Sequence, residues 1–154
     1  MWHWLKRWFQ RRTSPEPEPQ VWHFRIKGGR SEIGAVNDAL ERAAGAGEVP
    51  ELAMRAMQVA LDEVLTNAIT HGEVSLTDPM QVDLIVGRDS LRAVVSHAGT
   101  PFDPTQSATP DLEGSINERK IGGLGLHLVR SMMDEFTYEF VDGRNVLRLG
   151  KRFH

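Results

Sequence analysis

Three polar side chains recur at every fourth position in one stretch of the sequence. Glu63, Asn67 and His71 stand at i, i+4 and i+8, a spacing that aligns them along one stripe of an α-helix. A carboxylate can act as a general base on an attacking hydroxyl. An amide oxygen suits a Mg²⁺ ion that is shared with substrate phosphates. The stripe therefore indicates metal-assisted phosphate chemistry, with an ordinary solvated helix surface as the alternative.

Two glycine motifs downstream fit the same chemistry. Gly99-Thr100-Pro101-Phe102-Asp103-Pro104 follows an expected strand, where glycine permits the close approach of a flat ligand. Gly122-Gly123-Leu124-Gly125-Leu126 opens an expected helix, whose N–H groups and dipole favour phosphate. Arg119 and Lys120 precede it and can add positive charge. Each motif alone is also typical of a plain turn, so their combination carries the prediction of a magnesium–nucleotide site.

Three helices are expected to position these groups. The segment 50–71 has helical periodicity, with its proline at the first helical position and Gly72 as the stop. An earlier helix is expected to begin at Ser31 as its N-cap and to end at Gly45. A third helix is expected over 124–133, within and after the second glycine motif.

Five strands are expected from β-rich and alternating segments, and four of them form two hairpins. The expected strands are 21–27 at a sheet edge, 80–87 paired with 91–96, and 135–141 paired with 145–151 around Asp142-Gly143-Arg144. Adjacent strand pairs need antiparallel connections, which excludes a doubly wound sheet. We expect an α/β protein of the α+β two-layer type. Its mixed, largely antiparallel sheet would be covered on one face by about three helices.

The segment 100–120 contains three prolines and little periodicity. Loops of this length in compact domains are usually functional lids or disordered segments. Phe102 is expected to pack under this lid, and Asp103 is expected to cap its first turn.

The domain organisation follows from composition. Residues 21–154 are expected to form one domain, and residues 1–20 a disordered leader with a proline-rich linker at 13–20. Residues 1–12 hold three of the chain's four tryptophans and four basic residues. They suggest a contact with a membrane surface or a partner, with a plain leader as the alternative.

Several classes of function are disfavoured by composition. The chain has no cysteine, which excludes disulfides and thiolate metal sites. A net charge of −3 does not suggest nucleic-acid binding. Neither a run of about 20 apolar residues nor a secretory signal is evident, so a cytoplasmic location is expected.

In order and spacing, these motifs resemble those of the GHKL ATPase/kinase superfamily, whose ATP site has the Bergerat fold. The most similar group is the bacterial anti-sigma-factor serine/threonine kinases of partner-switching systems. The resemblance covers residues 21–153 and rests on four segments. They are Glu63-x-x-x-Asn67-Ala68-x-x-His71-Gly72 as the N box, Gly99-x-Pro101-Phe102-Asp103-Pro104 as the first glycine box, 119–130 as the second, and the hairpin 142–147.

The resemblance implies roles for individual residues. Glu63 would be the catalytic base and Asn67 would bind Mg²⁺. The remaining residues would contact ATP: Gly99 at the adenine, Gly122, Gly123 and Gly125 at the phosphates, and His71, His97, Arg119 and Leu124 elsewhere in the motifs. For His71, packing at the helix end is an equal alternative.

One position departs from the family pattern. The first glycine box normally reads Asp-x-Gly, and its Asp accepts a hydrogen bond from the adenine amino group, whereas this chain has His97. Neutral histidine has one acceptor nitrogen and protonated histidine has none. A misfitting buried partner would cost about 1–3 kcal/mol, or roughly ten- to hundredfold in affinity. Weak ATP binding, altered nucleotide choice or an inactive site would follow.

Two functions are therefore weighed. The first is a protein-serine/threonine kinase that uses Mg–ATP to phosphorylate a STAS-type antagonist and sequesters a regulatory partner such as a sigma factor. The resemblance also suggests a homodimer. The second is a non-catalytic binding module of the same fold, motivated by His97. A histidine kinase is not expected, because only residues 1–20 precede the domain.

Overall fold

A computed structural model describes residues 17–106 and 123–153. The order of its helices and strands is the order expected from the sequence. The elements are β1 Gln20–Ile26, α2 Arg30–Gly45, α3 Glu51–His71, β2 Met80–Val86, β3 Ser90–Ala98, the short 3-10 helix η1 Pro104–Gln106, α4 Gly123–Met132, β4 Glu135–Val141 and β5 Arg144–Arg152.

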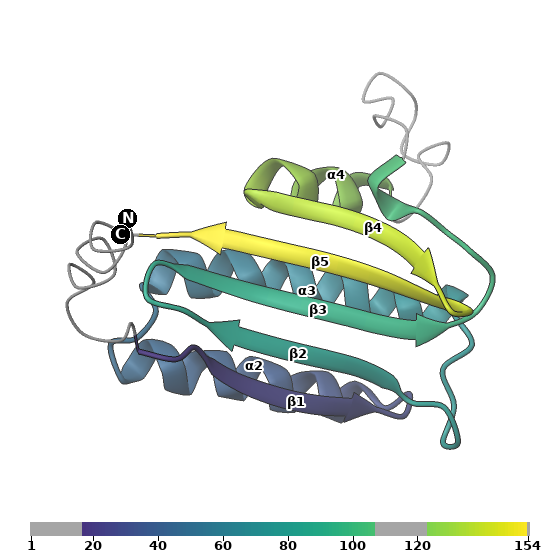
Figure 1. Ribbon diagram of the computed structural model, residues 1–154, viewed down its shortest axis with the longest axis horizontal. Coiled ribbons are helices and arrows are strands. Elements are labelled where there is room, and N and C mark those ends of the chain that lie inside the picture. Colours follow the sequence, from purple (N-terminus) through teal and green to yellow (C-terminus); the bar gives the residue numbers. More distant parts are fainter. Residues whose placement is uncertain (1–16, 107–122, 154) are drawn as a thin grey trace, which may run out of the picture.

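The five strands form one sheet in the order β1-β2-β3-β5-β4 (Figure 1). All four pairings between these described strands are antiparallel, so the sheet is more regular than the mixed sheet that was expected. β1 lies at an edge, as predicted, and β4 forms the other edge. The C-terminal hairpin inserts β5 beside β3, which brings the start of β5 next to the end of β3, where the first glycine motif begins.

The core lies between the sheet and its helices. In Figure 1, α2 and α3 run side by side behind the sheet, and α4 packs against α3. One alternating set of β2 and β3 residues is buried together with the apolar stripes of the helices. The fully buried side chains of α3 and β2 include Met57, Leu61, Leu65, Met80, Val82 and Leu84.

The helix boundaries differ from the predicted ones by a residue. α2 begins at Arg30 with Gly29 as its N-cap, so the prediction of Ser31 as N-cap was wrong. The carboxylate of Glu32 accepts hydrogen bonds from the N–H groups of Gly29 and Lys27 at 3.0 Å, which is the half of a capping box that the third helical residue provides.

The site helix α3 also starts one residue later than predicted. Pro50 is its N-cap rather than its first residue, because its ψ of 145° is extended. Gly72 follows the last residue of α3, as predicted, and donates its N–H to the carbonyl of Ala68. The helix at the second glycine motif, α4, begins at Gly123, one residue before its predicted start.

The C-terminal hairpin turns in two residues. Asp142 and Gly143 both have positive φ, at 51° and 76°, the backbone of a type I′ turn. Arg144 therefore pairs with Val141 at the start of β5, whereas it had been predicted within the turn. β3 likewise extends two residues beyond its predicted end, so His97 lies on a paired strand.

Some predictions concern residues outside the described ranges. These are the leader 1–12, residues 13–16 of the linker, the segment 107–120 of the lid, and the site residues Arg119 and Gly122. Within the described ranges, every helix is too short or too polar to cross a membrane.

Candidate functional site

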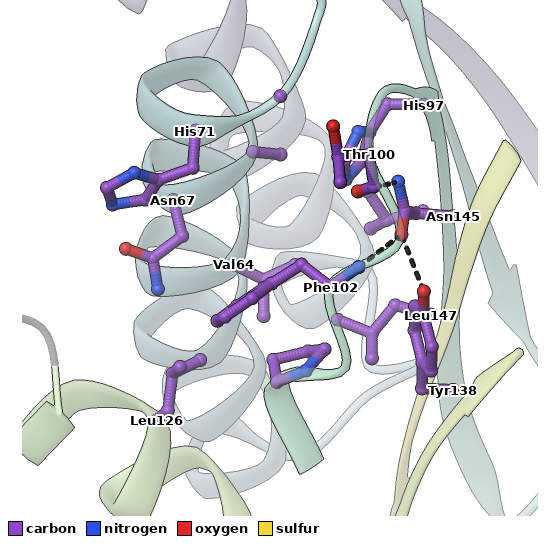
Figure 2. Close-up of a pocket in the computed structure, with 14 residues that line it drawn as sticks. Val64, Asn67, His71, His97, Thr100, Phe102, Leu126, Tyr138, Asn145 and Leu147 are labelled. Atoms are coloured by element: carbon purple, nitrogen blue, oxygen red, sulfur yellow. Dashed lines mark hydrogen bonds between the residues drawn. The ribbon is translucent and has the colours of Figure 1, made fainter. Parts of the chain in front are cut away.

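A pocket lies between the C-terminal half of α3 and the adjoining ends of β3 and β5. It contains about 510 Å³ of space, its open mouth included. Apolar side chains line most of it, and the polar lining comes from α3, β3, β4 and β5 (Figure 2). Three of the predicted site residues meet there: Asn67, His71 and His97. An apolar pocket with a few convergent polar groups is the usual form of a small-molecule site.

The three residues of the polar stripe on α3 lie in two places: Asn67 and His71 line the pocket, whereas Glu63 packs against α4. Asn67 and His71 lie one turn apart on the same side of α3 (Figure 2). Asn67 is half-buried, and within the described ranges its amide has no hydrogen-bond partner. Glu63 lies one turn earlier and is not a lining residue of the pocket. The predicted stripe is therefore present, with its carboxylate set apart from its amide and imidazole.

Glu63 lies against the first turn of α4. A methyl group built on Gly125 would overlap the Glu63 carboxylate, so the carboxylate packs directly on bare backbone. In the part of the chain that the structure describes, the Glu63 carboxylate takes part in no hydrogen bond or ion pair. The first turn of a helix has N–H groups without intrahelical partners, which favour negative charge. The structure thus joins the N box to the second glycine motif, 62 positions away.

His97 retains a hydrogen-bond acceptor. Its ring packs against Gly72, where a built methyl group would come within 2.8 Å of Nδ1. Nδ1 lies 2.9 Å from the carbonyl oxygen of Ala98, which can only accept, so Nδ1 carries the hydrogen. In the neutral ring, Nε2 is then an acceptor. A neutral His97 therefore offers one acceptor nitrogen at this position.

Gly99 shapes the exit of β3 without lining the pocket itself. Its φ of 137° lies in a region that other residues rarely adopt. An added methyl group would approach the backbone N of Glu73 to 3.3 Å. Two residues near it in the chain, His97 and Thr100, do line the pocket. Gly99 therefore affects the pocket by setting the direction of the backbone after β3, and its own atoms do not line the pocket.

Asp103 caps the turn, as predicted. Its Oδ1 accepts hydrogen bonds from the backbone N–H of Thr105 at 2.9 Å and from the Thr105 hydroxyl at 2.6 Å. The Arg130 side chain of α4 donates to the carbonyl of Thr105, which ties the same turn to α4. Phe102 projects over the pocket in Figure 2, and the lid under which it was expected lies largely outside the described residues.

Asn145 and Tyr138 line the pocket although neither was predicted as a site residue. Asn145 is the buried polar residue of the described ranges, with 3% of its surface exposed. It stands directly opposite His97 across the β3–β5 pairing, and Tyr138 of β4 donates its hydroxyl to it. The sequence places Asn145 at an inward-facing position of an alternating strand, which could have marked it as a buried polar residue. The alternation does not say which groups it bonds.

The comparisons with known proteins agree with this geometry. Residues 30–151 match the family described as the histidine kinase-like ATPase domain. Serine/threonine-protein kinase BtrW of Bordetella bronchiseptica is 33% identical over 96 residues, which are 60% of this chain and 66% of that protein. Serine-protein kinase RsbW of Listeria monocytogenes is 30% identical over 100 residues, 62% of this chain and 64% of that protein. The chain thus spans slightly less than two thirds of the length of these relatives.

A solved structure supports the fold. The RsbU and RsbW domains of Rv1364c from Mycobacterium tuberculosis align over 86% of this chain and 32% of theirs, with a TM-score of 0.59 and 17% identity. The family match extends from the start of α2 almost to the end of β5 and so includes the whole pocket. On this evidence, the chain belongs to the histidine kinase-like ATPase domain family.

Proposed function

We propose that this chain is an ATP-dependent protein-serine/threonine kinase domain. The observation that carries the proposal is the position of Glu63: its carboxylate is unpaired within the described ranges, packs on Gly125 and lies one turn from Asn67 at the pocket. The family and the kinase names of the relatives support the same class of reaction.

The residues present are compatible with a Mg–ATP complex. The pocket has the apolar lining suited to a nucleoside, with the acceptor of His97 at one end. The half-buried amide of Asn67 offers an oxygen of the type that Mg²⁺ accepts. Gly125 lies in the first turn of α4, a position at which helix N–H groups favour phosphate. Gly122, Gly123, Leu124 and Arg119 are proposed as further contacts on the strength of the sequence motif.

Each residue would then have a distinct task. Mg–ATP supplies a transferable γ-phosphoryl group whose charge the metal partly neutralises. Glu63 would accept the proton of the attacking serine or threonine hydroxyl. Asn67 would hold Mg²⁺, and His97 Nε2 would accept a hydrogen bond from the adenine amino group. His71, next to the pocket, is assigned to nucleotide contact.

The proposed protein substrate is a STAS-type antagonist, and the sequestered partner is a sigma factor or another regulator. These assignments rest on the motif resemblance. A phosphate adds about two negative charges, enough to disrupt an interface by repulsion and desolvation. We further propose a cytoplasmic location, a homodimeric state and a weak surface contact through residues 1–12.

The binding-module alternative rests on His97 alone. The hydrogen on Nδ1 leaves Nε2 as an acceptor, which supports retained adenine binding and weakens the case for a non-catalytic protein. The two alternatives predict opposite results for nucleotide binding.

Calorimetric titration with ATP and ADP, with and without Mg²⁺, tests the proposal. We expect the unmodified protein to bind ATP more tightly with Mg²⁺. Glu63→Gln, which keeps the size of the side chain, should bind ATP normally and fail to phosphorylate a candidate antagonist. Absence of binding by the unmodified protein, restored by His97→Asp, would favour the binding module. Normal phosphotransfer by Glu63→Gln would show that Glu63 is not the base.

A further inference from the structure

Asn145 holds the first glycine motif in place through its side-chain amide. Oδ1 accepts hydrogen bonds from the backbone N–H of Phe102 at 3.1 Å and from the hydroxyl of Tyr138 at 2.6 Å. Nδ2 donates to the carbonyl of Thr100 at 3.3 Å. Figure 2 shows the two bonds at Oδ1 meeting at the edge of the pocket.

These bonds take the place of strand pairing, which stops at the end of β3. Beyond Ala98 the chain leaves the strand and has no partner strand among the described residues. The side chain of Asn145 supplies hydrogen-bond partners for the partly buried N–H of Phe102 and carbonyl of Thr100. The loop is therefore attached to β5 by one amide.

The orientation of the amide is determined by its neighbours. A backbone N–H can only donate, so the atom facing Phe102 must be the oxygen. A carbonyl can only accept, so the atom facing Thr100 must be the nitrogen. The hydroxyl of Tyr138, the chain's only tyrosine, adds a second bond to the oxygen. A flipped amide would lose both bonds to the backbone of the loop.

The loop forms part of the wall of the pocket. Thr100 and Phe102 line it together with His97, which stands opposite Asn145 across the sheet. Phe102 exposes 56% of its surface and lies toward α3 in Figure 2, where a flat base can stack on its ring. This wall is the end of the pocket assigned to the base, whereas α4 forms the phosphate end.

We propose that Asn145, held by Tyr138, is a positioning residue that sets the pocket wall at residues 99–102 and thereby the affinity for the nucleotide base. The inference rests on the proposed nucleotide binding. Asn145 acts through the loop and has no part in phosphoryl transfer. Its loss should therefore raise KM for ATP while kcat remains unchanged.

The test combines nucleotide affinity with hydrogen exchange. Dissociation constants for ATP, ADP and AMP are measured without Mg²⁺, and exchange of the Phe102 amide is followed by NMR. Asn145→Ala should weaken all three nucleotides by the same factor, roughly ten- to hundredfold, and speed exchange at Phe102. Tyr138→Phe should give a smaller common loss. The double variant should be no weaker than Asn145→Ala, because both changes act through one amide.

Val36→Ala serves as the control for general destabilisation. Val36 is fully buried in α2 and does not line the pocket. It should lower stability while leaving nucleotide affinity and the Phe102 amide unchanged. An equal loss of affinity in this control, a loss confined to ATP, or unchanged exchange at Phe102 in Asn145→Ala would overturn the inference.

The proposed function can fail separately. If the unmodified protein binds none of the three nucleotides, the proposed function and the affinity part of this inference are both wrong. Exchange at Phe102 in Asn145→Ala would still decide whether Asn145 positions the loop.

Discussion

A methyl group at Gly125 would compete with the Glu63 carboxylate for the same space. The carboxylate lies directly on the backbone of Gly125, in the first turn of α4. Gly125→Ala therefore displaces the proposed base without changing it chemically. The carboxylate is the far end of a flexible side chain, so it can rotate away while both helices stay in place.

The expected effect on stability is small. Alanine is a better helix former than glycine by up to about 1 kcal/mol, which opposes the cost of moving the carboxylate. Gly34→Ala is the matched control, since Gly34 also lies in a helix and a methyl group there meets no atom within 4 Å. Both variants should unfold in urea at or slightly above the midpoint of the unmodified protein.

The expected effect on phosphotransfer is large. The carboxyl carbon must move by roughly 1.5 Å to reach an ordinary contact distance of about 3.5 Å. A displacement of about 1 Å at a reacting group costs on the order of a hundredfold in rate. We therefore expect kcat to fall about a hundredfold in Gly125→Ala and to remain unchanged in Gly34→Ala.

A double-variant cycle separates the base from the phosphate site. Glu63→Ala removes the carboxylate that Gly125→Ala would displace. If Gly125→Ala acts through Glu63, adding it to Glu63→Ala should cause no further loss of kcat. Wild-type kcat in Gly125→Ala would refute the packing argument. A further loss in the double variant would place the effect at the phosphates instead.

Three other predictions follow from single residues. Gly99→Ala should destabilise the protein by about 1–2 kcal/mol in urea unfolding, because its φ of 137° is strained for alanine; an unchanged midpoint would contradict this. Asn67→Ala should abolish the Mg²⁺-dependent gain in ATP affinity and leave Mg²⁺-free ADP binding intact in calorimetry, whereas loss of both would indicate a nucleotide contact. Arg144→Met removes the 2.8 Å bonds to Asp78 and Ser96. These groups are partly exposed, so about 1 kcal/mol or less should be lost. A loss that added salt does not reduce would argue against the ion pair.

Local sequence patterns determined much of this protein. Helical periodicity placed Glu63, Asn67 and His71 on one stripe, because side chains four residues apart share a helix face whatever surrounds them. Strand alternation, the glycine stop at Gly72 and the Asp103 cap are also local, and each was predicted. The motif order indicated the family, which the match over residues 30–151 confirms.

Only the tertiary structure decided which of these groups meet. Glu63 contacts Gly125 because α3 packs on α4, and Asn145 faces His97 because the last hairpin inserts beside β3. Such contacts depend on sheet order and helix packing, which sum weak interactions over the whole core. The acceptor on His97 likewise depends on where its ring lies relative to Ala98. The type of a residue determines which chemistry its side chain can perform, whereas long-range packing determines which groups the side chain contacts.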